Sequence, residues 1–117
     1  MPVLAEPVPD LDHISAIADP TRLAILALLR RRDHCVCHLV EQLELKQSVV
    51  SHHVGILRRA GLITSHPHPT DRRWLYYRVN RDALATLVES LQWLADDAEY
   101  DPTPLPCGAD VNSVGEA

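Results

Sequence analysis

The stretch that decides the fold runs over Gln47–Leu62 and reads QSVVSHHVGILRRAGL. Its apolar residues Val50, Val54 and Leu57 recur at intervals of four and three, which places them on one face of an α-helix. Gly61 ends the pattern, since glycine commonly follows the last turn of a helix. The opposite face carries small or hydrogen-bonding residues: Gln47, Ser48, Ser51, His52 and Gly55. The sequence therefore predicts an amphipathic helix with a polar face toward solvent.

Three shorter helices are expected before this stretch. The first covers Leu11–Ala18. Asp19 and Pro20 begin the second, because aspartate caps the free N–H groups of a first turn and proline fits the first helical position. This second helix is almost entirely apolar and ends at Arg30–Arg32, whose positive charges suit the negative end of the helix dipole. A short third helix spans Val36–Leu43.

Two strands and a last helix are expected after the stretch Gln47–Leu62. Leu62–Ser65 and Trp74–Val79 have strand character and predict one antiparallel hairpin with a long tip. Helical spacing returns from Arg81 to about Ala98. The apolar stripe of this last helix consists of Leu84, Leu87, Leu91 and Leu94, with Val88 beside them. Because no further core remains for the stripe to cover, we expect it to pack against a partner in a homodimer.

These elements predict a mainly α fold with a small β-hairpin: a winged helix-turn-helix protein that is dimeric. A chain of 117 residues has room for a single core. We expect a flexible N-terminal arm over residues 1–10, a DNA-binding and dimerisation domain over 11–99, and a flexible tail with one cysteine over 100–117. Prolines and the lack of periodicity mark both ends as irregular.

The composition argues against several other classes of protein. No apolar run approaches the roughly 20 residues of a membrane span, and Met1–Asp12 lacks the features of a signal peptide. Three cysteines are too few, and odd in number, for a disulfide scaffold. We therefore expect a cytoplasmic protein without a membrane partner or a permanently bound cofactor. An enzyme is not expected either, since no phosphate-binding glycine loop, Ser/His/Asp order or carboxylate pair is visible.

Charge is strongly segregated along the chain, although the net charge is only −5. Residues 46–81 carry seven basic residues against one acid, a net charge of +6, whereas residues 82–117 carry eight acids and no base. Such a basic block is either a solvated face without a partner or the footprint of a nucleic acid. In a winged helix-turn-helix protein the fourth helix enters the DNA major groove and the hairpin follows the backbone, which favours the second interpretation.

We expect the polar face of the quoted stretch to contact double-stranded DNA. Hydroxyl, amide and imidazole groups suit base edges, and arginines suit phosphates. The expected DNA-binding residues are Gln47, Ser48, Ser51, His52, Arg58, Arg72 and Arg73. His53 adjoins the buried row, so a packed core histidine is the expected role for this residue.

Four blocks of the sequence resemble, in order and spacing, the ArsR/SmtB metalloregulatory repressors. They are ADPTR at Ala18–Arg22, LVEQL at Leu39–Leu43, the quoted stretch Gln47–Leu62, and RRWLYY at Arg72–Tyr77. The resemblance covers residues 11–98. It implies a homodimeric repressor that pairs through its first and last helices and leaves its operator when a toxic metal or metalloid ion binds.

The segment Cys35-Val36-Cys37 resembles the signature of the arsenic- and antimony-responsive branch of that family. The resemblance implies As(III) or Sb(III) as the inducer, held by Cys35 and Cys37. Soft thiolates select such ions, and a helix N-terminus is expected to lower a thiol pKa. Side chains two residues apart diverge by about 200° on a regular helix, so joint ligation requires a distorted first turn. The alternative is a pair of small buried hydrophobic residues.

Trivalent arsenic prefers three thiolates, and the third is expected from the tail. The best-known form of the branch carries a third cysteine where this chain has Val40. Cys107 is therefore the only remaining cysteine that could supply a third thiolate. At about 3.3 Å per residue the tail can extend about 25 Å, to the third helix of its own subunit or of the partner. The alternative for Cys107 is a free thiol in an irregular tail.

Two alternatives to an arsenic site follow from the neighbouring residues. His34 and His38 flank the cysteine pair, and zinc or cadmium sites combine Cys and His ligands. The family's other zinc site, on the last helix, is excluded because residues 81–99 contain no histidine. The second alternative is a thiol redox switch on the same fold, with a disulfide between Cys107 and either Cys35 or Cys37.

Overall fold

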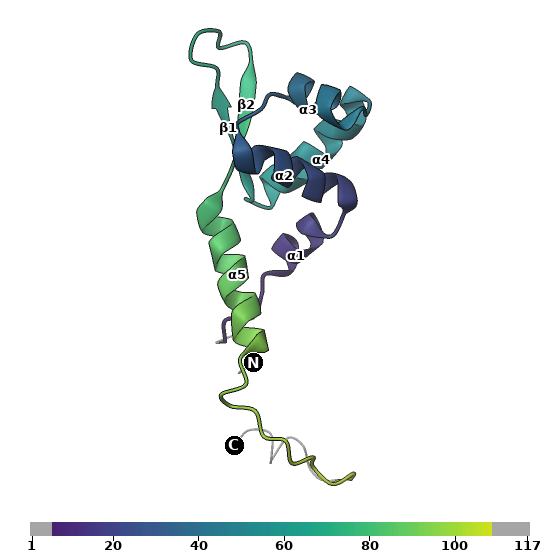
Figure 1. Ribbon diagram of the computed structural model, residues 1–117, viewed down its shortest axis with the longest axis vertical. Helices are drawn as coiled ribbons and strands as arrows, with labels where there is room; N and C mark the ends of the chain where they lie inside the picture. The colour runs from purple at the N-terminus through teal and green to yellow at the C-terminus, as the bar shows by residue number, and fades with distance from the viewer. Residues whose placement is uncertain (1–5, 109–117) are drawn as a thin grey trace.

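The computed structural model describes residues 6–108 (Figure 1). In this part of the chain, five helices and one hairpin follow each other in the expected order. Their bounds are α1 Leu11–Ile17, α2 Pro20–Arg31, α3 Val36–Leu43, α4 Gln47–Arg59, β1 Ile63–Pro67, β2 Leu75–Val79 and α5 Arg81–Ala95. The expected mainly α fold with a winged hairpin is confirmed. Residues 1–5 of the expected arm and 109–117 of the expected tail lie outside the described residues.

Three helices begin with a side chain that accepts hydrogen bonds from the free N–H groups of the first turn. Asp10 caps α1, and Asp19 caps α2 by accepting from the backbone of Thr21 at 2.8 Å and of Arg22 at 3.1 Å. Asn80 caps α5 through the backbone N–H of Ala83. The start of α2 at Pro20, directly after its aspartate cap, is as the sequence predicts.

The core lies between α2, α3, α4 and the end of the hairpin at which Ile63 pairs with Val79. Val50, Val54 and Leu57 of α4 are buried, which confirms the face predicted from their spacing. The side chains that meet them are Ile25 and Leu29 of α2, Leu39 of α3, Leu62, Ile63 and Val79. Because α4 is packed along its whole apolar face, its polar face is held outward in a fixed orientation.

The hairpin pairs β1 with β2 from Ile63 opposite Val79 to Pro67 opposite Leu75. Gly61 has a φ of 80°, a conformation that favours glycine, and it turns the chain from α4 into β1. Asn80, the residue after β2, donates from its side-chain amide to the Gly61 carbonyl at 2.9 Å. One side chain therefore joins the end of α4 to the start of α5.

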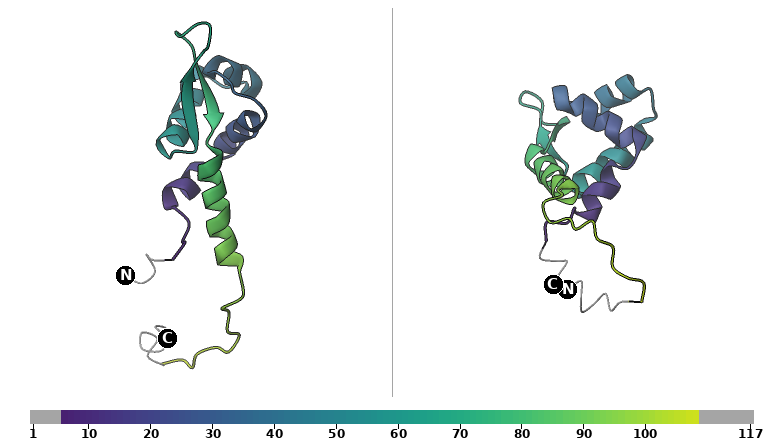
Figure 2. Two further views of the ribbon diagram at one scale, coloured as in Figure 1. Left: turned by 90° about the vertical axis from the view of Figure 1, so that its left-hand side faces the viewer. Right: turned by 60° about the horizontal axis from the view of Figure 1, so that its bottom comes forward.

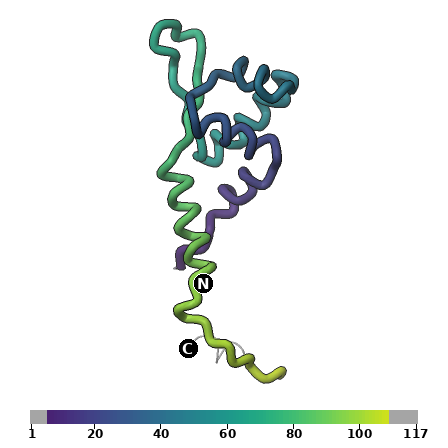
Figure 3. The backbone as a smooth tube through the Cα atoms, viewed as in Figure 1, coloured from purple at the N-terminus to yellow at the C-terminus, as the bar shows by residue number. Residues whose placement is uncertain are grey.

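The last helix projects away from the rest of the fold. Figures 1 and 2 show α5 leaving the end of β2 and running away from α3 and α4, and the tube in Figure 3 shows the tail continuing in that direction. The molecule is accordingly elongated, with extents of 63 × 25 × 23 Å. No helix in the described range of residues is long and apolar enough to span a membrane.

The end of α5 differs from the expectation. The helix ends at Ala95 rather than near Ala98, because the apolar stripe stops at Leu94 and the aspartates that follow are unfavourable at the negative end of a helix dipole. Of the stripe, Leu87 is buried and Leu84 is half-buried. The exposed members are Val88, Leu91 and Leu94.

We expect the buried face of α2 to dominate the stability of the domain. Leu29 is 2% exposed, so Leu29→Ala should lower the free energy of unfolding by about 2–5 kcal/mol through lost burial and the cavity it leaves. Leu23 on the same helix is 52% exposed, and Leu23→Ala should change the free energy of unfolding by less than about 1 kcal/mol. Urea unfolding of both variants at one protein concentration provides the comparison. Equal losses would contradict this assignment of the core.

Candidate metal centre and DNA-binding surface

The two cysteines of the Cys-Val-Cys segment lie on either side of the start of α3. Cys35 is the residue before the helix and has an extended backbone with φ −82° and ψ 168°, whereas Cys37 belongs to the first turn. Because Cys35 is outside the helix, its side chain does not diverge from that of Cys37 as it would within a regular turn. The two sulfur atoms lie 2.7 Å apart. The extended cap residue thus supplies the departure from helical geometry that joint ligation requires.

One of the two neighbouring histidines joins this pair. A ring nitrogen of His38 and the sulfurs of Cys35 and Cys37 all lie within 4.8 Å of one another. His34 is not a member of that group, and its Nδ1 is buried without a hydrogen-bond partner among the described residues. Burial, followed by the nearby charge of His38, lowers the pKa of His34, so this ring is neutral at physiological pH. The geometry therefore favours His38 over His34 as a third ligand.

The protonation of the thiol pair differs from the expectation. The hydrogen bond with Cys35, followed by burial and the charge of a Cys35 thiolate, raises the pKa of Cys37. We expected the helix N-terminus to lower a thiol pKa, but the second sulfur at 2.7 Å outweighs it, chiefly because the hydrogen bond between the two sulfurs favours the protonated thiol. The pair therefore holds at least one proton at neutral pH.

The segment before the pair is attached to the hairpin. The backbone of His34 and the backbone of Tyr77 on β2 exchange two hydrogen bonds, at 2.8 and 3.3 Å. Asp33 also accepts from the guanidinium of Arg78, with a shortest contact of 2.9 Å. Neither link was predicted, because partners more than 40 residues apart leave no local signal in the sequence.

An open cavity of about 710 Å³ adjoins the cysteine pair. On one side it is bounded by Cys35, Cys37 and His38, and on the other by the hairpin. The hairpin residues in its wall are His68, Pro69, Asp71, Trp74, Leu75 and Tyr76. The sequence predicts that Trp74 and Tyr76 belong to the hairpin, but not that they line a cavity beside the cysteines.

The third cysteine is not brought to this site within one subunit. Cys107 is exposed and belongs to the tail after α5, which leads away from α3 in Figure 3. The described residues that gather around the pair include His38 and not Cys107. Ligation by Cys107 of the same subunit, which chain length alone allowed, is absent from this arrangement.

The expected DNA-contacting face of α4 is open to solvent. Gln47, Ser48, Ser51 and His52 are exposed, and Arg58 is exposed near the C-terminal end of the helix. His53 is only half-buried, and its Nδ1 accepts a hydrogen bond from the Arg22 guanidinium at 3.0 Å. This contact makes His53 a structural residue, as its position beside the buried row predicts.

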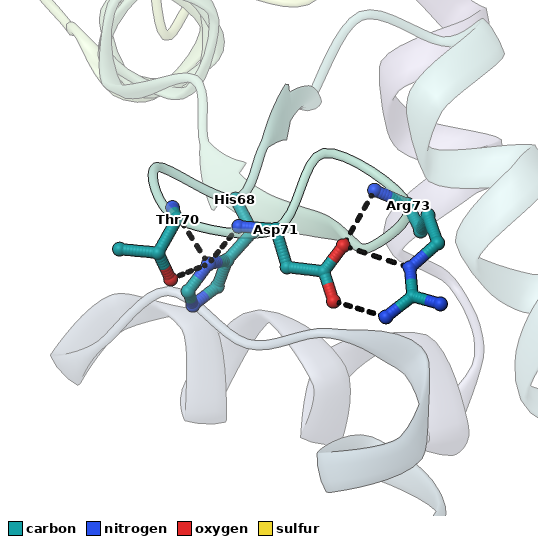
Figure 4. Close-up of polar contacts among 4 residues, drawn as sticks. All are labelled: His68, Thr70, Asp71 and Arg73. Carbon is teal, nitrogen blue, oxygen red and sulfur yellow. Dashed lines mark hydrogen bonds and ion pairs between the residues drawn. The ribbon is translucent and has the colours of Figure 1, made fainter.

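The tip of the hairpin carries two arginines, of which one forms an ion pair and the other does not. Arg73 forms a two-pronged ion pair with Asp71, whose oxygens accept from its Nε at 3.0 Å and its Nη2 at 2.8 Å (Figure 4). The ring of His68 accepts from the backbone N–H groups of Thr70 and Asp71 and stabilises the turn. Arg72 is exposed and has no ion-pair partner among residues 6–108. Arg72 is therefore the more available positive charge at the tip.

Known proteins resemble this chain in both sequence and structure. Residues 19–65 match the family described as "Bacterial regulatory protein, arsR family". The arsenic resistance transcriptional regulator ArsR1 of Pseudomonas putida is 36% identical over 110 residues, covering 78% of this chain and 81% of the relative. The repressor SmtB of Mycobacterium tuberculosis is 37% identical over 85 residues, covering 73% of this chain and 62% of the relative.

A solved structure agrees with these matches. The ArsR-like transcriptional regulator from Rhodococcus sp. RHA1 superposes with a TM-score of 0.68 at 26% identity, over 86% of this chain and 88% of that chain. These relatives and this fold are those of transcription regulators rather than enzymes. With its winged hairpin and exposed fourth helix, the chain belongs to the arsR family of bacterial transcription regulators.

Proposed function

We propose that this chain is a homodimeric repressor that binds double-stranded operator DNA in the cytoplasm and is released by As(III) or Sb(III) at Cys35 and Cys37. The observation that carries the proposal is the 2.7 Å separation of the two sulfurs in front of α3. Paired thiols favour soft, thiophilic ions over the hard ions that prefer oxygen ligands. The relatives named for arsenic resistance support the same class of inducer.

The third ligand of inorganic arsenic is proposed to come from outside the subunit. Cys107 of the partner subunit is one source, because the tail leads away from the pair in its own subunit. A small external thiol is the other source. Either one completes the three sulfur positions that trivalent arsenic prefers.

The proposed response reaches the DNA-binding elements through two contacts. Binding of both sulfurs to one atom changes their separation and therefore the conformation at Cys35, which follows directly after the His34 backbone that is bonded to β2. On the other side, Leu39 of α3 packs in the core with Val50 and Val54 of α4. A rearranged first turn of α3 would thus change the contacts of α3 with both the hairpin and α4.

Cadmium or zinc is the second candidate for the inducer. The specific observation in its favour is the position of His38, because Cys35, Cys37 and His38 supply three of the four ligands of a tetrahedral site. The thiol redox switch has less support, since it needs Cys107 next to the pair and the tail leads elsewhere.

DNA binding should depend on the tip of the hairpin and the face of α4. Arg72→Ala should weaken binding to every sequence and reduce the salt slope by about one unit per protomer, because one phosphate contact is lost. Arg73→Ala should have a smaller effect, since Asp71 already neutralises this arginine. Ser51→Ala or His52→Ala should instead relax base preference. Titrating a labelled operator and a base-substituted version of it at several salt concentrations measures both effects; unchanged affinity for both sequences in all four variants would refute the DNA-binding surface.

Release by arsenite should require the two cysteines before and in α3. Cys35→Ser and Cys37→Ser should bind the operator like the parent and fail to release it with arsenite. Cys107→Ser is the matched control, and it should weaken release only when no external thiol is present. The measurement is operator release in reduced protein, with and without added glutathione. A parental response in all three variants would exclude a cysteine site.

The pH dependence of binding should separate the two inducer classes. Cadmium displaces a proton from each protonated thiol, and the pKa of Cys37 is raised. The affinity of the site for cadmium should therefore fall as the pH is lowered, by about tenfold per pH unit for each proton displaced. Arsenous acid loses its hydroxyl groups as water with the thiol protons, so its affinity should stay nearly constant below the thiol pKa. Calorimetry with each ligand between pH 6 and about pH 8 tests this difference.

Dimerisation should depend on the exposed part of the α5 stripe. Val88, Leu91 and Leu94 are 52%, 43% and 59% exposed, and burying them against a second α5 is favourable. Leu91→Glu with Leu94→Glu should yield a monomer in sedimentation at micromolar concentration, whereas Glu89→Gln, on the side of α5 opposite Leu91, should leave the dimer intact. A parent protein that sediments as a monomer would contradict the proposal.

A further inference from the structure

We propose that Cys35, Cys37 and the adjoining cavity form a site for trivalent arsenicals that carry one organic substituent, with an aromatic ring as the best fit. This inference rests on the proposed function, since it assumes that the cysteine pair binds trivalent arsenic. It adds a role for the cavity wall, which the response to inorganic arsenite does not use.

The number of sulfurs matches the valence of such a compound. Trivalent arsenic makes three bonds, and one of them is already a bond to carbon in a compound of the type R–As(OH)₂. Two thiols complete it: two As–O bonds break, two As–S bonds form, and each hydroxyl leaves as water with a thiol proton. Arsenic stays trivalent and the As–C bond remains intact, so the step needs no oxidant or reductant. The pair at 2.7 Å is therefore a complete ligand set for this class.

When inorganic arsenite binds to this pair, in contrast, the third bonding position of arsenic has no thiolate. Within residues 6–108, the third group near the two sulfurs is the ring nitrogen of His38, and Cys107 is absent from the cluster. Nitrogen is a harder ligand than the sulfur that arsenic prefers. A monosubstituted arsenical thus needs nothing from the partner subunit or from an external thiol.

The cavity beside the sulfurs offers room and the right surface for the substituent. Its volume of about 710 Å³ falls within the range of small-molecule sites. The wall opposite the cysteines includes Trp74, Leu75 and Tyr76. Trp74 and Leu75 are 51% and 47% exposed, so a bound ring covers apolar surface that otherwise faces water. An aromatic ring also stacks favourably on an indole or a phenol.

The position of this wall connects the ligand to DNA binding. Tyr76 precedes Tyr77, whose backbone is bonded to His34, and Arg72 lies two residues before Trp74 at the tip. A substituent between α3 and the hairpin therefore touches both elements at once. Its contact with the hairpin adds to the change that the sulfurs make at the start of α3.

The test compares phenylarsine oxide, which hydrates to the phenyl compound of this class, with arsenite. The background is Cys107→Ser in buffer without external thiol, so that only the pair is available. Operator release and calorimetric binding are both measured. We expect one phenylarsine oxide per protomer and release at a concentration at least tenfold below that of arsenite. Trp74→Ala should raise this concentration by about tenfold and leave the arsenite response of the otherwise native chain unchanged.

Control variants separate the cavity wall from general damage to the fold. Trp74→Phe should keep most of the response to phenylarsine oxide, and Leu75→Ala should reduce it, which provides a second variant if Trp74→Ala folds poorly. Trp93→Phe on α5 should have no effect and leaves Trp74 as the one tryptophan whose fluorescence phenylarsine oxide should quench.

The outcomes distinguish this inference from the proposed function. Equal release by the two arsenicals in the Cys107→Ser background, or an unchanged phenylarsine oxide response in both Trp74→Ala and Leu75→Ala, would overturn the inference and leave the arsenic-responsive repressor standing. Failure of both compounds to bind the reduced native chain would overturn both proposals.

Discussion

The candidate site depends on two backbone hydrogen bonds between His34 and Tyr77. They attach the segment between α2 and α3 to β2 and hold it extended up to the first residue of α3. If the helix began one turn earlier, Cys35 and Cys37 would point in different directions. The same pairing brings Trp74, Leu75 and Tyr76, at the start of β2, opposite the sulfurs. The closeness of the two thiols, the cavity and the link to the hairpin are thus consequences of one short segment of sheet-like pairing.

A second network fixes α4 relative to the other helices. The Arg22 guanidinium donates to the Ala16 carbonyl at 2.6 Å, to the Ser15 carbonyl at 3.2 Å and to Nδ1 of His53 at 3.0 Å. One side chain therefore joins the end of α1, the start of α2 and the middle of α4. The polar face of α4 is presented by a rigid support and not by the helix alone.

Local features of the sequence were enough to predict the elements and the outward face of α4. The cap at Asp19, the apolar spacing from Val50 to Leu57 and the stop at Gly61 each act within a few residues, and each was confirmed. The surroundings of the cysteines were only partly predictable. Their proximity to each other and to His38 follows from local backbone geometry, but the cavity wall depends on the pairing of residues more than 40 positions apart. The raised pKa of Cys37 also required the position of the second sulfur.

The attachment of the cysteine segment to the hairpin has a thermodynamic consequence. A ligand releases the operator only to the extent that it binds the DNA-free arrangement more tightly than the DNA-bound one. In the proposed repressor, reciprocity then requires that operator DNA lower the affinity for the inducer by the same factor by which the inducer lowers the affinity for DNA. A coupling of 100-fold corresponds to about 2.7 kcal/mol, on the order of a few hydrogen bonds. The two His34–Tyr77 bonds and the Asp33–Arg78 ion pair join the segment before Cys35 to β2 of the hairpin, and a change in their geometry is of the right magnitude to carry this coupling.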